Sequence, residues 1–222
     1  MTGLPVVVKI CCIASVDEAR LAVTEGAAVL GLVSAMPSGP GVIDDSRVAE
    51  IAAAVVPPTE TFLLTSRTRA AAIAEQHRHA RTTALQLVDH VPHDELRSLR
   101  RQLPGVRLVQ VIHVLDEGSV DEAVAAAPLV DALLLDSGNP RATVKELGGT
   151  GRRHDWRISR RIRDAVAPLP LFLAGGLNAG NVGDAIAAVR PHGVDLCSSV
   201  RSDGRLDGAR LRAFFDAVRR AA

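Results

Sequence analysis

The stretch Val6-Val7-Val8-Lys9-Ile10-Cys11-Cys12 decides how the rest of this chain is interpreted. Its valines predict a buried strand, because β-branched side chains fit a pleated, packed surface. Side chains alternate along a strand, so Lys9 and Cys11 share one face. Taken alone, a buried cysteine is most often an inert small apolar residue. An ammonium and a thiol on the inner face at the end of a strand are nevertheless poorly suited to an apolar core. This strand end is therefore a candidate site.

The rest of the chain alternates similar apolar runs with helical segments. Further strands are expected over residues 28–33, 59–65, 83–87, 106–114, 131–136, 170–174 and 193–198. Helices are expected over about 15–26, 45–55, 68–79, 92–101, 119–127, a segment after 155, 179–189 and 207–220. Strands that are apolar throughout are typical of parallel sheets covered on both faces.

Eight strand–helix units predict the α/β class and one (β/α)8 TIM barrel, a single domain over residues 1–222. An open doubly wound sheet is the alternative. Such a sheet often carries a Gly-rich turn after its first strand, whereas residues 11–14 are Cys-Cys-Ile-Ala.

Composition excludes several classes of function. A net charge of +1, 2% aromatic residues and no Tyr argue against a nucleic-acid or membrane partner. The three cysteines are an odd number and lack a Cys-x-x-Cys pair, so neither a disulfide framework nor a metal site is expected. No signal-peptide pattern or membrane-spanning run is present, so we expect a cytoplasmic protein.

The strand ends carry the chemistry in such a barrel, because active sites lie at the C-terminal ends of the strands. Asp136 ends the apolar run 132–135 and is the best candidate acid. Because residues 137–140 are Ser-Gly-Asn-Pro, Asp136 could instead only cap a turn. Cys11 follows the first strand and belongs to the same set of strand ends.

Two later loops predict a phosphate site. Loops after strands seven and eight often offer backbone N–H groups to phosphate, and glycines let the backbone approach closely. Ordinary turns are the alternative interpretation. The candidate phosphate ligands are Gly175, Gly176, Asn178, Ser198 and Ser199.

Lys9 and Asp195 are expected to form a buried ion pair. The first and eighth strands are neighbours in a closed barrel, and both side chains should point inward. Burial without a partner would be costly for either charge. A nearby ammonium would also favour the thiolate form of Cys11.

Several motifs then appear together in one order. They are Val8-Lys9-Ile10-Cys11, Leu133-Leu134-Leu135-Asp136, Gly148-Gly149-Thr150-Gly151 with His154-Asp155-Trp156, Leu173-Ala174-Gly175-Gly176-Leu177 with Asn181-Val182, and Val194-Asp195-Leu196-Cys197-Ser198. In these motifs the chain resembles the phosphoribosylanthranilate isomerase family over nearly its whole length.

The resemblance implies an isomerase of tryptophan biosynthesis that performs an Amadori rearrangement on a phosphorylated sugar. Asp136 would match the general acid and Cys11 the general base, with Lys9, Gly149 and Gly151 supporting the site. No cofactor is implied. The protein could be a monomer or a homodimer.

The chain also departs from the family pattern. Cys12 stands where the family usually has Gly, and Gly41 where it has an Arg that holds the anthranilate carboxylate. Val88-Asp89 replaces a His-Gly pair. Further along, Ser199 replaces a Gly and Arg201 a Glu.

These departures concern the end that would hold the anthranilate carboxylate. Arg141 or Lys145 could supply a replacement cation there. The alternatives are a paralogous isomerase of another phosphorylated aminoaldose, or a non-catalytic barrel that binds a sugar phosphate.

Overall fold

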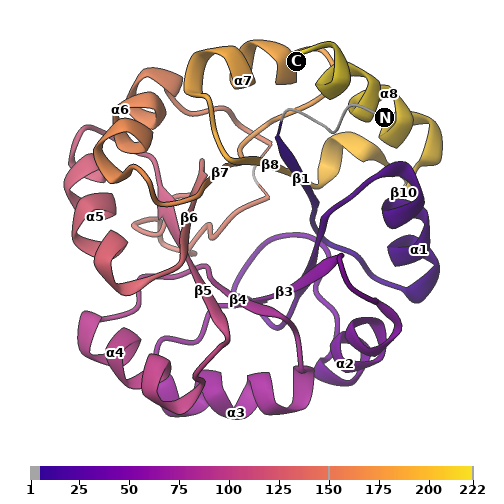
Figure 1. Ribbon diagram of the computed structural model, residues 1–222. Helices are drawn as coiled ribbons and strands as arrows, with labels where there is room; N and C mark the ends of the chain where they lie inside the picture. The colour runs from indigo at the N-terminus through magenta and orange to yellow at the C-terminus, as the bar shows by residue number, and fades with distance from the viewer. Residues whose placement is uncertain (1–5, 150, 222) are drawn as a thin grey trace.

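The computed structural model describes residues 6–149 and 151–221, and these residues form the expected barrel (Figure 1). Eight parallel strands pair in chain order, and β8 pairs with β1 to close the ring. The barrel strands are β1 (Val7–Ile10), β2 (Val29–Val33), β3 (Glu60–Thr65), β4 (Ala84–Leu87), β5 (Arg107–His113), β6 (Ala132–Asp136), β7 (Leu171–Leu173) and β8 (Gly193–Leu196).

An outer ring of helices covers the strands (Figure 1). The α-helices are α1 (Val16–Glu25), α2 (Asp45–Ala54), α3 (Ala70–Ala80), α4 (His93–Gln102), α5 (Gly118–Ala126), α6 (Trp156–Val166), α7 (Val182–Val189) and α8 (Gly208–Arg220). Shorter elements are the 3-10 helices η1 (Ala127–Leu129) and η2 (Ser198–Val200) and a hairpin of β9 (Arg201–Ser202) and β10 (Arg205–Leu206). Among the described helices, none is long and apolar enough to cross a membrane.

The ends of α1 illustrate why the helices lie where they do. Ser15 caps the helix, since its side chain accepts a hydrogen bond from the Glu18 amide at 3.1 Å. Gly26 ends it in the left-handed conformation, with φ +114°.

Two predicted boundaries near the site were wrong. The eighth strand ends at Leu196 rather than at residue 198, because residues 198–200 wind into η2. The helix after β7 begins at Val182 rather than near 179. There the Asn181 side chain accepts the Asn178 amide at 2.9 Å, which holds a turn ahead of the helix.

The interior of the barrel is packed and not open as a channel. Phe62 and Phe172 meet edge to face with ring centroids 6.0 Å apart. Gly193 makes room for them, since a Cβ there would lie 2.5 Å from Phe172 Cε1. A second apolar layer fills the space between strands and helices. In such a packed barrel, the active-site cleft lies over the C-terminal ends of the strands.

The expected ion pair joins the first and last strands. Lys9 lies opposite Asp195 in the β1–β8 register, and Lys9 Nζ is 2.9 Å from Asp195 Oδ1. Lys9 is 0% exposed. Burial alone would lower the pKa of Lys9, but the negative charges of Asp195 and Cys11 outweigh it and raise that pKa.

We predict that Lys9→Met lowers the free energy of unfolding by about 3–5 kcal/mol, because it leaves the Asp195 carboxylate buried without a partner. Urea unfolding measured by circular dichroism checks this. The matched control is Lys9→Met with Asp195→Leu, which removes both charges and should recover most of the loss. A double variant no more stable than Lys9→Met would contradict the explanation.

Candidate active site

A cleft lies over the C-terminal ends of the strands, with about 710 Å³ of space between its walls and in the open solvent at its mouth. Every stretch of its wall comes from a strand end or from the loop that follows one. The lining residues are Cys11, Cys12, Val33, Met36, Ser38, Gly39, Pro40, Leu64, Gln86, Asp136, Leu147, Gly148, Gly149, Gly151, Ala174, Gly175, Gly176, Leu177, Asp195, Leu196, Cys197 and Ser198.

Cys11 lies at the rim, one residue beyond β1. Its amide donates to the Leu196 carbonyl at 2.9 Å, so the β8 strand end fixes its backbone. Gly31 on β2 makes room for the thiol, since a Cβ there would lie 2.8 Å from Cys11 Sγ and 3.0 Å from Lys9 Nζ. The thiol and the ammonium thus flank one glycine, as expected from the alternation along β1.

The neighbouring thiols differ in their tendency to ionise. Hydrogen bonds to the sulfurs of Cys11 and Cys197, together with burial, raise the pKa of Cys12. The same Cys12 hydrogen bond, with the nearby charge of Arg201, lowers the pKa of Cys197 against the effect of burial. Cys12 is therefore a neutral thiol, and it donates to the Pro40 carbonyl at 3.6 Å, so it is a poor candidate for the base.

Asp136 ends β6 and lines the same cleft. Its Oδ1 accepts the Ser137 amide at 2.7 Å. Burial raises the pKa of Asp136 more than that hydrogen bond and the charges of His113 and Lys9 lower it. A carboxyl group with a raised pKa keeps its proton closer to neutral pH, as a general acid requires.

Gly148 is a site residue that the sequence analysis did not single out. A Cβ at this position would lie 2.7 Å from Asp136 Oδ2, and the backbone has φ +132°. The loop after β6 can therefore cover the acid only because residue 148 has no side chain. Its place in the Gly148–Gly151 motif was the available signal. Thr150 of that motif lies outside the described residues.

The glycine loop after β7 lies where the predicted phosphate site would be. Gly175 and Gly176 line the cleft with φ +86° and +64°. A Cβ on Gly175 would be 3.0 Å from His154 Nδ1, and one on Gly176 would be 2.7 Å from the Gly151 carbonyl. Burial lowers the pKa of His154 to about 4, so this imidazole is neutral near pH 7.

Some predicted residues are not brought to the cleft wall. Ser198 lines it, but Asn178 and Ser199 do not. The Asn178 side chain accepts the Gly180 amide at 2.8 Å within its own turn. Lys9 lies beneath the wall rather than in it.

Neither candidate replacement cation lies in the wall of the cleft. Arg141 Nη1 is 3.7 Å from Asp116 Oδ2 on the outside of the loop. Lys145 Nζ is 2.5 Å from Asp89 Oδ2. Among the described lining residues there is no lysine or arginine, and the wall opposite the glycine loop is largely apolar, with Met36 and Leu64.

Two departures from the family pattern share a steric cause. A Cβ on Gly41 would lie 2.4 Å from Cys12 Cβ and 3.0 Å from Cys12 Cα. Cys12 thus occupies the space where a side chain at residue 41 would begin. With this backbone conformation, side chains at residues 12 and 41 would occupy the same space.

Gln86 is a second residue that sequence reasoning missed. It points inward from β4 into the cleft, and it is buried. Its Oε1 has no hydrogen-bond partner among the described residues. Its inward position in the strand was the signal that could have found it.

Comparison with known proteins gives one consistent result. Residues 8–217 match the family model described as N-(5'phosphoribosyl)anthranilate (PRA) isomerase. The N-(5'-phosphoribosyl)anthranilate isomerase of Methanocella arvoryzae is 35% identical over 96% of this chain and 97% of its own length.

Solved structures agree with this assignment. The phosphoribosyl anthranilate isomerase of Thermotoga maritima is 26% identical, covers 96% of this chain and 98% of its own, and superposes with a TM-score of 0.82. A further isomerase structure, in complex with reduced 1-(o-carboxyphenylamino)-1-deoxyribulose 5-phosphate, has 24% identity over 96% of this chain and 98% of its own, and a TM-score of 0.79. This chain belongs to the N-(5'-phosphoribosyl)anthranilate isomerase family.

Proposed function

We propose that the chain isomerises N-(5'-phosphoribosyl)anthranilate in tryptophan biosynthesis, with Cys11 as general base and Asp136 as general acid. Membership of the isomerase family supports the activity. The observation that carries the assignment of roles is that a thiol and a carboxyl group with a raised pKa line one cleft, on strands β1 and β6 of the ring.

The reaction follows from the two groups. Asp136 gives its proton to the ring oxygen of the ribose, and the C1–O bond breaks to leave an iminium at C1. Cys11 then removes the proton from C2, and the electron pair moves into the C1–C2 bond to form an enolamine. Tautomerisation of the enolamine gives the 2-ketone. Only protons move, so the chemistry requires no redox cofactor.

Lys9 supports the base from below the cleft. Its ammonium and the Cys11 thiol flank Gly31, so a buried positive charge lies beside the candidate base. If Lys9 moved away, Asp195 would be left buried without a partner. The ion pair therefore holds the Lys9 ammonium in place.

The phosphate would bind at the loops after β7 and β8, next to the β1 end of the cleft, since β8 pairs with β1. Gly175 and Gly176 allow close approach of an anion to the backbone, and Ser198 faces the same space at the start of η2. Gly149 and Gly151, from the loop after β6, complete this wall. We expect these groups to hold the substrate while the ring opens.

Cys11→Ala and Asp136→Asn should each lower kcat by about 100-fold or more, since each removes a proton-transfer group. The assay follows the loss of fluorescence as N-(5'-phosphoribosyl)anthranilate is consumed. Cys197→Ala is the matched control, because this thiol lines the same cleft. Loss of turnover in Cys197→Ala with retention in Cys11→Ala would assign the base to Cys197.

Asp136→Asn should also stabilise the fold in a pH-dependent way. The folded-state pKa of Asp136 is raised by burial, so ionisation of Asp136 costs stability above that pKa. The Tm of Asp136→Asn should exceed that of the wild type at pH 8. The difference should vanish as the pH falls below about 4, where Asp136 is protonated in both the folded and unfolded states. A pH-independent difference in Tm would contradict this account.

A second candidate function follows from the apolar wall of the cleft. Since no lysine or arginine lies among the described lining residues, isomerisation of phosphoribosyl amines that lack a carboxylate is also favoured. Losing charge-assisted hydrogen bonds to a carboxylate ordinarily costs about 1.5–3 kcal/mol, or roughly 10- to 150-fold in kcat/KM.

We therefore expect kcat/KM for N-(5-phosphoribosyl)aniline to lie within about 10-fold of the value for the anthranilate compound. Both substrates form from ribose 5-phosphate and the free amine, and chromatographic separation of aldose and ketose measures turnover. The phosphoribosyl compound made from 4-aminobenzoate is the control, because it carries the same carboxylate charge at a different position of the ring. A preference above 100-fold for anthranilate would mean that a cation reaches the carboxylate when substrate binds.

A further inference from the structure

The turn that follows the candidate base has an unusual backbone. Cys12 adopts φ +64°, a left-handed conformation that is easy for glycine and unfavourable for residues with a Cβ. Cys11 is the residue immediately before it. The direction in which Cys11 presents its thiol therefore depends on whether Cys12 stays in this conformation.

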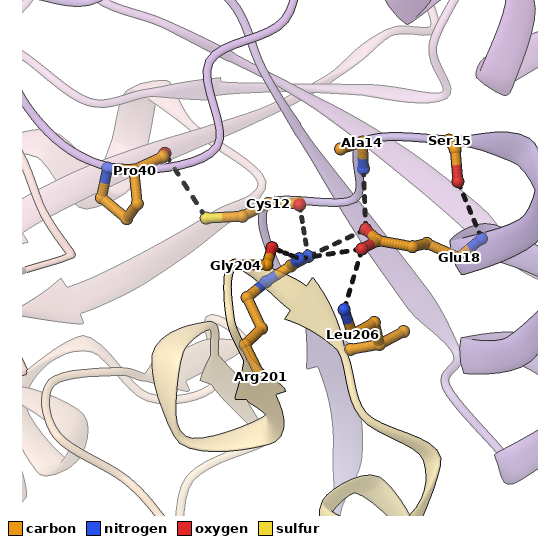
Figure 2. Close-up of polar contacts among 8 residues, drawn as sticks. All are labelled: Cys12, Ala14, Ser15, Glu18, Pro40, Arg201, Gly204 and Leu206. Carbon is orange, nitrogen blue, oxygen red and sulfur yellow. Dashed lines mark hydrogen bonds and ion pairs between the residues drawn. The ribbon is translucent and has the colours of Figure 1, made fainter.

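Arg201 holds the carbonyl of that strained residue (Figure 2). The arginine lies on β9, far along the chain, and its Nη2 donates to the Cys12 carbonyl oxygen. Its Nη1 donates to the Gly204 carbonyl at 2.9 Å. The guanidinium thus links the β9–β10 hairpin, which follows β8, to the turn after β1.

Glu18 fixes the guanidinium in turn (Figure 2). Arg201 donates to its Oε1 at 3.0 Å and to its Oε2 at 3.1 Å. The same carboxylate accepts the Ala14 amide at 3.0 Å and the Leu206 amide at 2.9 Å. Burial opposes ionisation of Glu18, but Arg201 and these two amides outweigh it and lower its pKa.

Both side chains of this pair are largely enclosed, at 10% exposed for Arg201 and 15% for Glu18. An enclosed pair is screened little by solvent, and its bidentate geometry restricts both partners. Neither residue lines the cleft. Arg201 reaches the site in two ways: it contacts the turn at Cys12, and its charge lowers the pKa of the Cys197 thiol.

We propose that Arg201, oriented by Glu18, is a positioning residue for the base: it clamps the Cys12 carbonyl and so holds the Cys11 thiol toward the cleft. This inference rests on the proposed function of Cys11. Without the clamp, the Cys12–Ile13 peptide keeps the hydrogen bond from its Ile13 amide to the Gly31 carbonyl at 3.0 Å, but its carbonyl loses the charged donor that favours the strained conformation. Cys11, whose amide is tied to the Leu196 carbonyl, then loses one of the restraints on the direction of its thiol.

The sharpest test is a double-mutant cycle on Arg201 and Cys12. Arg201→Met should lower kcat by about 10- to 100-fold with KM changed less than about 2-fold, because a misdirected base weakens the reaction step and not phosphate binding. In a Cys12→Gly background the same change should lower kcat by less than about 3-fold, because glycine adopts positive φ without a clamp.

Arg100→Met is the matched control. Arg100 donates to Asp131 Oδ2 at 2.8 Å and to the Leu129 carbonyl at 3.4 Å, so it also joins a carboxylate to a backbone carbonyl. It does so beside the start of β6, at the opposite end of the barrel. Its loss should lower Tm and leave kcat unchanged.

Glu18→Gln is a milder second variant in case Arg201→Met fails to fold. The amide keeps an acceptor oxygen but loses the charge that orients Arg201, so a smaller loss of kcat is expected, again suppressed by Cys12→Gly. An equal loss of kcat in both backgrounds, or an equal loss for Arg100→Met, would overturn the inference.

A readout independent of turnover separates this inference from the proposed function. Absence of isomerase activity in the wild type would refute the function alone. The clamp is then tested by the rate of Cys11 alkylation with iodoacetamide, resolved by peptide mass spectrometry. Alkylation should be slower in Arg201→Met than in the wild type, because the thiol no longer points toward the cleft, and this difference should disappear with Cys12→Gly. An unchanged rate would refute the clamp.

Discussion

The ion pair between Lys9 and Asp195 is the constraint on which the site depends. Closing an eight-stranded ring brings the first strand beside the last, and the register places these two charges opposite each other. Two charges buried together are costly, yet either one alone would cost more. The pair therefore ties the positive charge to a single place beneath the cleft. Cys11 lies two residues beyond Lys9 on the same face. The ion pair that forms when the barrel closes therefore also places a positive charge beside the candidate base.

The turn after β1 depends in a similar way on a contact from a distant part of the chain. Left-handed backbone at Cys12 costs roughly 1–2 kcal/mol, and a hydrogen bond from a charged donor contributes about 1.5–3 kcal/mol. Because the two magnitudes are comparable, the contact from Arg201 is large enough to decide the conformation of the turn. The Glu18 carboxylate matters for the same reason, since a mobile guanidinium would lose side-chain entropy on forming that contact.

The sequence predicted the barrel and which strand ends meet at the cleft, because those features follow from periodicity. Alternation along β1 placed Lys9 and Cys11 on one face, and parallel closure placed Asp195 opposite Lys9. The strand ends supplied Asp136. Local patterns could not predict Gly148 against the acid, or Arg201 on the Cys12 carbonyl, because both contacts join segments distant in the chain. The failed boundary at residue 179 had a local cause, an asparagine turn that competes with helix.

The departures at residues 12, 41 and 201 are best understood as linked. A side chain at 12 leaves no space for a Cβ at 41. The same side chain makes the left-handed conformation of residue 12 costly, and the contact from Arg201 offsets that cost. Glycine at 12 would adopt this conformation without such a contact. Glycine at 12 would remove the 2.4 Å contact with a Cβ at 41, although the 3.0 Å contact with the residue 12 Cα and φ +76° at residue 41 would remain, and it would leave little need of an arginine at 201. Reverting residue 41 alone would therefore produce a clash with Cys12, so the chemistry of the loop after β2 can change only together with the turn that carries the base.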